Sequence, residues 1–139
     1  MTVKELYERL GADYNDAMER VFDEDLLKML CGMFLEDKSY GTLSEALSKE
    51  DYPAAFESAH TLKGVAANLG FSRLYNVASD LTEALRGGTP KGDVDGLYSK
   101  VKDEYELTAE SQSLGLAVHL LGIITGLGGE YYAAADPLR

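Results

Sequence analysis

The sequence predicts an all-α protein, an antiparallel four-helix bundle preceded by short accessory helices. Apolar residues recur at the 3.6-residue period of a helix in successive segments, which are separated by glycines and by residues that favour helix N-termini. No alternating run of β-branched residues of useful length appears, so strands are not expected. At 139 residues the chain has the length of one domain that can bury a core.

The segment before residue 39 predicts two short helices and then a longer one. Thr2, with Glu5 three residues later, fits a capping box, and Gly11 ends the first helix. Asp13 can cap the second short helix and Asp23 the longer one. The inward stripe of the longer helix is predicted to contain Leu26, Leu27, Leu30, Met33 and Phe34, with Met29 as a further candidate.

The segment that Asp23 opens is predicted to continue as helix over 39–49, which Gly41 can interrupt, and the two together form the first long arm of a helical hairpin. Residues 51–70 predict one helix that returns antiparallel to this arm. Asp51 can cap the returning helix, Pro53 (in its first turn) fits there, and Gly70 can stop it in a left-handed conformation. Winding it at 100° per residue predicts a core face: Ala55, Ala59, Leu62, Ala66 and Leu69. The other face is predicted to carry Phe56, His60, Lys63, Gly64 and Ala67.

Two further helices complete the predicted bundle. Ser72 is predicted to cap the first and Gly87-Gly88 to end it, and Asp93 opens the second. The buried face of the first is predicted to contain Leu74, Val77, Ala78, Leu81 and Leu85. That of the second is predicted to contain Val94, Leu97, Val101 and Tyr105, with Tyr98 as a further candidate.

The C-terminal part differs in composition from the bundle. Residues 1–107 are predicted to form the bundle, and residues 108–139 a glycine-rich apolar extension that packs on it as a helix. Residues 113–129 hold five glycines and no charged side chain. A membrane span is the alternative, but the run has only the minimum length of roughly 17 residues. Gly122 and Gly126 have a small-xxx-small spacing, so a homodimer through this tail is a hypothesis.

The net charge indicates which classes of partner the protein can bind, and the cysteine content indicates the cellular compartment. The net charge is −11 and no run of five basic residues occurs, so nucleic acid is not an expected partner. Cys31 is the single cysteine, which excludes an internal disulfide and favours a reducing compartment. The first residues are charged and helical rather than apolar, so a signal peptide is not expected and the predicted location is the cytoplasm.

The predicted exposed face of residues 51–70 has the chemistry of a phosphoryl acceptor. Neutral imidazole is a nucleophile near neutral pH, so His60 can attack phosphorus. A phosphoryl group on its ring would carry about two negative charges, which Lys63 at i+3 can offset. Gly64 costs about 1 kcal/mol of helix propensity relative to alanine. It indicates either a partner that approaches the backbone or a close crossing of two helices.

The sequence around His60 resembles the signature of histidine-containing phosphotransfer (HPt) domains. His-Thr-Leu-Lys-Gly at residues 60–64, followed by Val-Ala-Ala-Asn-Leu-Gly, carries the resemblance. It extends over roughly residues 3–107 through further matching positions: Phe34 with the following Leu-Glu-Asp, Leu43, Ala46-Leu47, Asp51, Leu81 and Leu85.

The resemblance implies a helical bundle in a multistep two-component phosphorelay. His60, at Nε2, would accept a phosphoryl group from a receiver-domain aspartate or a sensor histidine kinase and pass it to a second receiver. Lys63 would be the charge partner and Gly64 the gap for the receiver, whose own metal ion would supply most of the transition-state stabilisation. Phe56 and Ala67 are predicted to form part of an apolar docking patch around the histidine.

One position departs from the family pattern. Family members often carry Gln or Glu near the imidazole, 22 positions after the histidine, where this chain has Thr82. Its hydroxyl can still hydrogen-bond, so Thr82 is predicted to belong to the same site.

Other chemistries are not expected. Nucleotide-binding motifs are not evident, so the chain is not expected to bind ATP. It is predicted to be a phosphotransfer intermediate and not an enzyme that turns over a substrate of its own. No cofactor is implied. A metal site is not expected either, because His60 and His119 are far apart in sequence. A helical adaptor or dimerisation module that binds signalling partners without phosphorylation is the alternative function. The departure at Thr82 and the unusual tail favour it, and the intact His-x-x-Lys-Gly argues against it.

Overall fold

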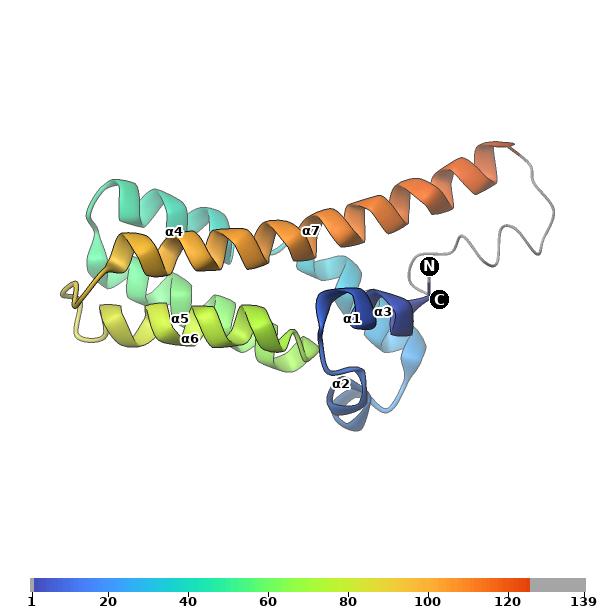
Figure 1. Ribbon diagram of the computed structural model, residues 1–139, viewed down its shortest axis with the longest axis horizontal. Coiled ribbons are helices and arrows are strands. Elements are labelled where there is room, and N and C mark those ends of the chain that lie inside the picture. Colours follow the sequence, from blue (N-terminus) through green and yellow to red (C-terminus); the bar gives the residue numbers. More distant parts are fainter. Residues whose placement is uncertain (1, 126–139) are drawn as a thin grey trace.

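The computed structural model describes residues 2–125, with side chains described through residue 112. The helices are α1 (Val3–Leu10), α2 (Tyr14–Val21), α3 (Glu24–Phe34), α4 (Ser39–Ser48), α5 (Tyr52–Leu69), α6 (Ser72–Leu85) and α7 (Val94–Thr125). No strand occurs among the described residues, so the all-α prediction is confirmed. Helices α4 to α7 lie lengthwise side by side as the bundle, and α1, α2 and α3 gather at one end of it (Figure 1).

Local capping chemistry defines most of the helix ends. At five predicted N-caps the side chain accepts a hydrogen bond from a backbone N–H in the first turn of its helix, as expected: Thr2, Asp13, Asp23, Asp51 and Asp93. The predicted cap at Ser72 is wrong, because α6 already begins at that residue and Phe71 precedes it with no side-chain acceptor. The Ser72 hydroxyl instead donates to the Gly70 carbonyl at 3.4 Å. Gly41 does not interrupt α4, and the predicted first long arm is instead broken at residues 35–38, between α3 and α4.

Helix α5 lies between α4 and α6 and buries the face that its sequence predicts. The five predicted core residues are all buried: Ala55, Ala59, Leu62, Ala66 and Leu69. At its C-terminus Gly70 has φ +69°, the left-handed stop expected there. The outward face of α5 therefore has a fixed orientation on the bundle.

Helix α3 buries a narrower stripe than its sequence predicts. Cys31 is buried, as expected of a core thiol, together with Leu27 and Phe34. The inward placement predicted for three other residues is wrong, because these are exposed: Leu26 (38%), Met29 (55%) and Met33 (55%). The reason is position. Helix α3 lies beyond the end of the four-helix bundle, where α2, α5 and α7 contact it along one side only.

Helix α7 crosses the predicted boundary at residue 107 without a break and continues to Thr125. It packs against α6 in the bundle and, further along, against α1 (Figure 1). Thr108, Ser111 and Gln112 are buried. The division of the chain at residue 107 stays a prediction.

The proposed self-association of the tail is not tested by this structure. Gly126, one of the two glycines in the small-xxx-small pair, lies outside the described residues, as does the end of the apolar run over 113–129. Among residues 2–125, no helix has both the length and the apolar character needed to cross a bilayer.

Candidate functional site

His60 lies in the middle of α5 with its imidazole exposed to solvent. Within the described part of the chain the ring makes no hydrogen bond or ion pair. Its partner is the ring of Phe56, one turn earlier, which is parallel to it within 10° at a centroid distance of 6.0 Å. Both ring nitrogens are therefore available to a second molecule.

Lys63 lies one turn after the histidine, on the side of α5 that faces α6. Its Nζ lies 5.9 Å from the centroid of the Tyr75 ring, a cation–π distance. Its charge also helps to lower the pKa of the Glu83 carboxyl, after the larger contribution of the hydrogen bond from Arg86. The ammonium group is therefore directed along the α5–α6 seam towards Tyr75.

Gly64 is exposed one turn after His60, and its surroundings decide between two explanations for it. Apart from its chain neighbours and the backbone of its own helix, no atom of the described residues lies within 4 Å of the position that a Cβ would take there. A close crossing of two helices would place atoms against that Cβ, so the packing of this chain does not require the glycine. The approach of a second molecule to the α5 backbone, the other explanation offered by the sequence, stays a prediction.

Of the other predicted site residues, Ala67 is partly exposed to solvent, whereas Thr82 is buried. Ala67 is half-buried on the same side of α5, and its carbonyl accepts a hydrogen bond from Arg20 of α2. Thr82 is completely buried, and its hydroxyl donates to the Ala78 carbonyl in its own helix at 2.7 Å. The prediction that Thr82 contacts a partner beside the imidazole therefore does not fit its position, because its side chain is inside the bundle.

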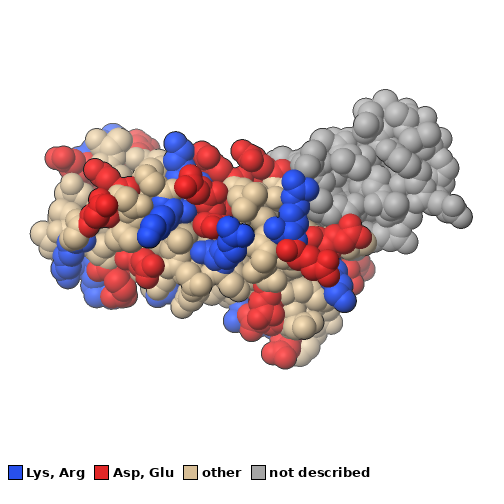
Figure 2. Space-filling view, viewed as in Figure 1, with Lys and Arg blue, Asp and Glu red and all other residues tan. Residues whose placement is uncertain are grey.

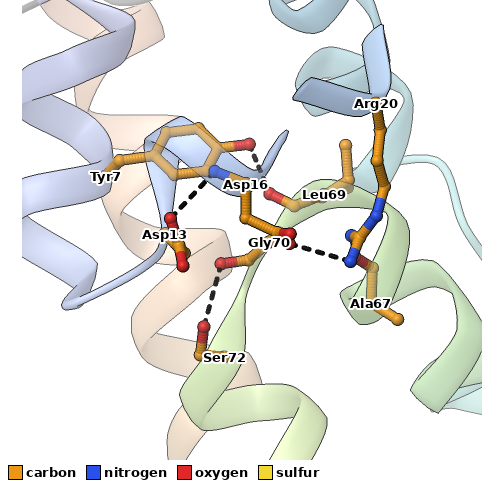
Figure 3. Close-up of polar contacts among 8 residues, drawn as sticks. All are labelled: Tyr7, Asp13, Asp16, Arg20, Ala67, Leu69, Gly70 and Ser72. Carbon is orange, nitrogen blue, oxygen red and sulfur yellow. Dashed lines mark hydrogen bonds and ion pairs between the residues drawn. The ribbon is translucent and has the colours of Figure 1, made fainter. Parts of the chain in front are cut away.

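The end of α5 is held by the N-terminal helices (Figure 3). The Tyr7 hydroxyl donates to the Leu69 carbonyl at 2.5 Å. The Asp13 N–H donates to the Gly70 carbonyl at 2.8 Å. Arg20, which donates to Ala67, is also paired with the Asp16 carboxylate at 2.8 Å. Carbonyls at a helix C-terminus lack partners within the helix. These contacts satisfy the Leu69 carbonyl and add a further donor to the carbonyls of Ala67 and Gly70, which also accept from the backbone N–H groups of Gly70 and Ser72. Together they hold the end of the helix that carries His60.

An apolar groove of about 410 Å³ borders the same helix on its α3 side. Its lining is Arg20, Val21, Leu30, Met33, Phe34, Asp37, Val65, Asn68 and Leu69. Met33 is exposed at its edge, and Phe22, between α2 and α3, is 84% exposed with φ +63°. The groove lies along the second half of α5, so it begins at Val65, about one and a half turns from His60. This groove was not predicted from the sequence, because the apolar period of residues 24–34 places Leu30 and Met33 in the core.

Charges of both signs are distributed over the bundle. Acidic and basic side chains alternate on the face in view, with no continuous basic area (Figure 2). Within the described residues, no three His, Cys, Asp or Glu side chains gather in a way that could hold a metal ion.

These features define a class of protein, a helical bundle that presents a histidine to solvent beside a lysine and an open glycine. The family model described as Hpt domain matches residues 25–114, and the chain therefore belongs to the Hpt domain family. A search of curated proteins and a search of solved structures each find no match. Hpt domains are phosphotransfer carriers of two-component signalling that interact with receiver domains and histidine kinases.

Proposed function

We propose that this protein relays a phosphoryl group through His60 between receiver-domain aspartates, or from a sensor histidine kinase to a receiver. The observation that carries the proposal is the exposed imidazole of His60, which no described residue engages in a hydrogen bond. A histidine with this environment is accessible to a nucleophilic role.

The transfer step uses the neutral imidazole. The lone pair of Nε2 attacks phosphorus in line, an N–P bond forms, and the P–O bond to the receiver's aspartate breaks. The electron pair leaves on the aspartate oxygen as a carboxylate, and Nδ1 keeps its proton. Lys63 supplies positive charge beside the new phosphoryl group. No nucleotide takes part in this step.

The receiver would dock over Gly64 and along the groove between α3 and α5. Three observations support this surface: the open space at Gly64, the exposed Phe22 and Met33, and the continuity of the groove with the helix that carries His60. Apolar contacts at the centre of an interface supply most of its affinity. Phe56 and Ala67 would extend the same contact on the other side of the histidine.

The proposal places the protein in the cytoplasm, and the unpaired Cys31 thiol supports a reducing compartment. Fractionation of cells followed by immunoblotting would test this location. Recovery in the membrane or exported fraction would contradict it.

The test of the relay uses the full chain and a receiver domain from the same organism, phosphorylated with labelled phosphate. Label should move to the protein, survive alkali and be lost in acid, as expected of phosphohistidine. His60→Gln should abolish labelling, and His119→Gln, at the other histidine of the sequence, should not. A folded wild type that takes no label from any receiver or kinase of that organism would reject the proposal and favour the non-phosphorylated adaptor.

A further inference from the structure

Three side chains form a stack that ends at the imidazole of His60. The Phe56 ring is parallel to the imidazole, and on the Phe56 ring the guanidinium of Arg86 lies 5.4 Å from the centroid. Phe56 comes from the first half of α5, whereas Arg86 follows the last residue of α6. The stack therefore ties the histidine to a second element of the bundle.

Arg86 is itself held in place. Its Nε donates to one oxygen of Glu83 at 3.0 Å and an Nη donates to the other oxygen at 2.7 Å. Such a two-point contact fixes the plane of the guanidinium as well as its position. The same contact lowers the pKa of the Glu83 carboxyl, and the charges of Arg86, Lys63 and Lys91 lower it further.

The imidazole has no other support among the described residues. The family position that often carries a hydrogen-bonding side chain near this ring is occupied by Thr82, which is buried and bonded to Ala78. The χ2 torsion of an exposed histidine is broad, with two roughly equivalent ranges. A stacked aromatic neighbour favours one orientation by about twofold to tenfold.

We propose that Phe56 is the positioning residue of the phosphoryl acceptor and that Arg86, held by Glu83, keeps Phe56 in place. This inference rests on the proposed role of His60. The stack restricts rotation of the imidazole before the receiver arrives, so a larger fraction of encounters has the attacking nitrogen directed outward. Phe56 does not touch phosphorus, so apart from its apolar contact with the receiver it acts on the transfer step through His60.

The first test needs no phosphate. In the full-length protein, NMR couplings and ring-current shifts of the His60 imidazole should show one preferred orientation. Phe56→Leu keeps an apolar side chain but removes the flat ring, so the couplings should become averaged and the shift should be lost. Phe56→Tyr should retain both. Arg86→Gln should cause a smaller change in the same direction.

Arg73→Gln is the matched control for Arg86→Gln. Arg73 lies in α6, is exposed to the same degree as Arg86 (side-chain exposure 52% and 53%), and binds Glu104 through two hydrogen bonds. It is not stacked on Phe56, so its loss should leave the His60 signals unchanged. An equal effect of both arginine substitutions would overturn the proposed role of Arg86.

The second test measures single-turnover transfer from a phosphorylated receiver. Phe56→Leu should lower the maximum rate by about twofold to tenfold, with little change in the half-saturating receiver concentration. A purely docking role would raise that concentration instead. Unchanged imidazole signals and an unchanged maximum rate in Phe56→Leu would overturn this inference alone. Absence of transfer to the wild type would overturn the proposed function as well.

Discussion

The hydroxyl of Tyr7 donates to the carbonyl of Leu69 across 62 positions of sequence, at 2.5 Å and out of contact with solvent. Tyr7 also lies 3.6 Å from the Cys31 sulfur, so three separate segments meet at this hydroxyl. The bond joins the first helix to the last turn of the helix that carries His60. Loss of this hydrogen bond should therefore loosen the end of the helix that carries His60 and lower the free energy of unfolding.

Tyr7→Phe should lower the free energy of unfolding by about 1–3 kcal/mol, because it leaves a buried carbonyl without its partner. Urea denaturation followed by circular dichroism measures this change. Tyr52→Phe is the control, since the Tyr52 hydroxyl has no hydrogen-bond partner among the described residues. Similar losses in both variants would show that the Tyr7 bond does not contribute as described.

Gly70→Ala and Gly64→Ala should change stability in opposite directions. At Gly70 the added Cβ would lie 2.6 Å from the Asp13 carbonyl oxygen, and φ is +69°, so a loss of about 1–2 kcal/mol or more is expected. At Gly64 the Cβ meets open space in a helix, so a gain of up to about 1 kcal/mol is expected. Thermal unfolding of the two variants measures both. Destabilisation by Gly64→Ala would contradict the open space described there.

Gly64→Glu should impair phosphotransfer while leaving helicity intact. The larger, negatively charged side chain would occupy the space through which the receiver approaches, and it would repel the phosphoryl group. Circular dichroism and single-turnover labelling measure the two properties. Gly41→Glu is the control, because Gly41 is also an exposed glycine within a helix and its Cβ likewise meets nothing. Normal transfer by Gly64→Glu would reject the argument from close approach.

Met33→Lys should weaken receiver binding by about 1 kcal/mol or more, which is about fivefold in Kd, if the groove is the docking surface. Stability should change little, because 55% of the Met33 surface is already exposed. Titration calorimetry with an unphosphorylated receiver measures the affinity. Ser99→Lys adds the same charge at an exposed position of α7 and should have no effect. Unaltered affinity in Met33→Lys would remove the groove from the interface.

Stability should fall in alkaline solution through Cys31. Burial raises the pKa of its thiol from 9.0 to about 11, although the hydrogen bond with Tyr7 lowers it in part. Above pH 9 the unfolded chain loses this proton and the folded chain keeps it, so the free energy of unfolding decreases by up to about 1.4 kcal/mol per pH unit. Urea denaturation from pH 8 to 10 should show a shallower decline in Cys31→Ala. Identical slopes would contradict this assignment.

Local chemistry predicted the helix that carries the site. Asp51 and Gly70 are end signals that act within a few residues, and the period of the alanines and leucines determines which face of α5 is buried. The exposure of His60 follows from that same period. This is why the centre of the site could be predicted from sequence alone.

Contacts between distant segments could not be predicted in this way. Arg86 lies 30 residues after Phe56, and nothing in the local sequence of either indicates that they meet. The pairing of Arg86 with Glu83, at i+3, was predictable. So was the burial of Thr82, which lies four residues after Ala78 on the stripe predicted for the core. The exposure of Met33 depends on how few neighbours α3 has, a property of the tertiary structure.

The bonds at the end of α5 have a consequence for the size of the smallest polypeptide that can fold. Sequence comparison delimits the family segment at residues 25–114, but Tyr7, Asp13 and Arg20 all precede it. A fragment cut at the family limits would leave the carbonyls of Ala67, Leu69 and Gly70 without these donors and would uncover the side of α7 that α1 covers. The first two helices are thus part of the folding unit, although the match that identifies the family does not include them.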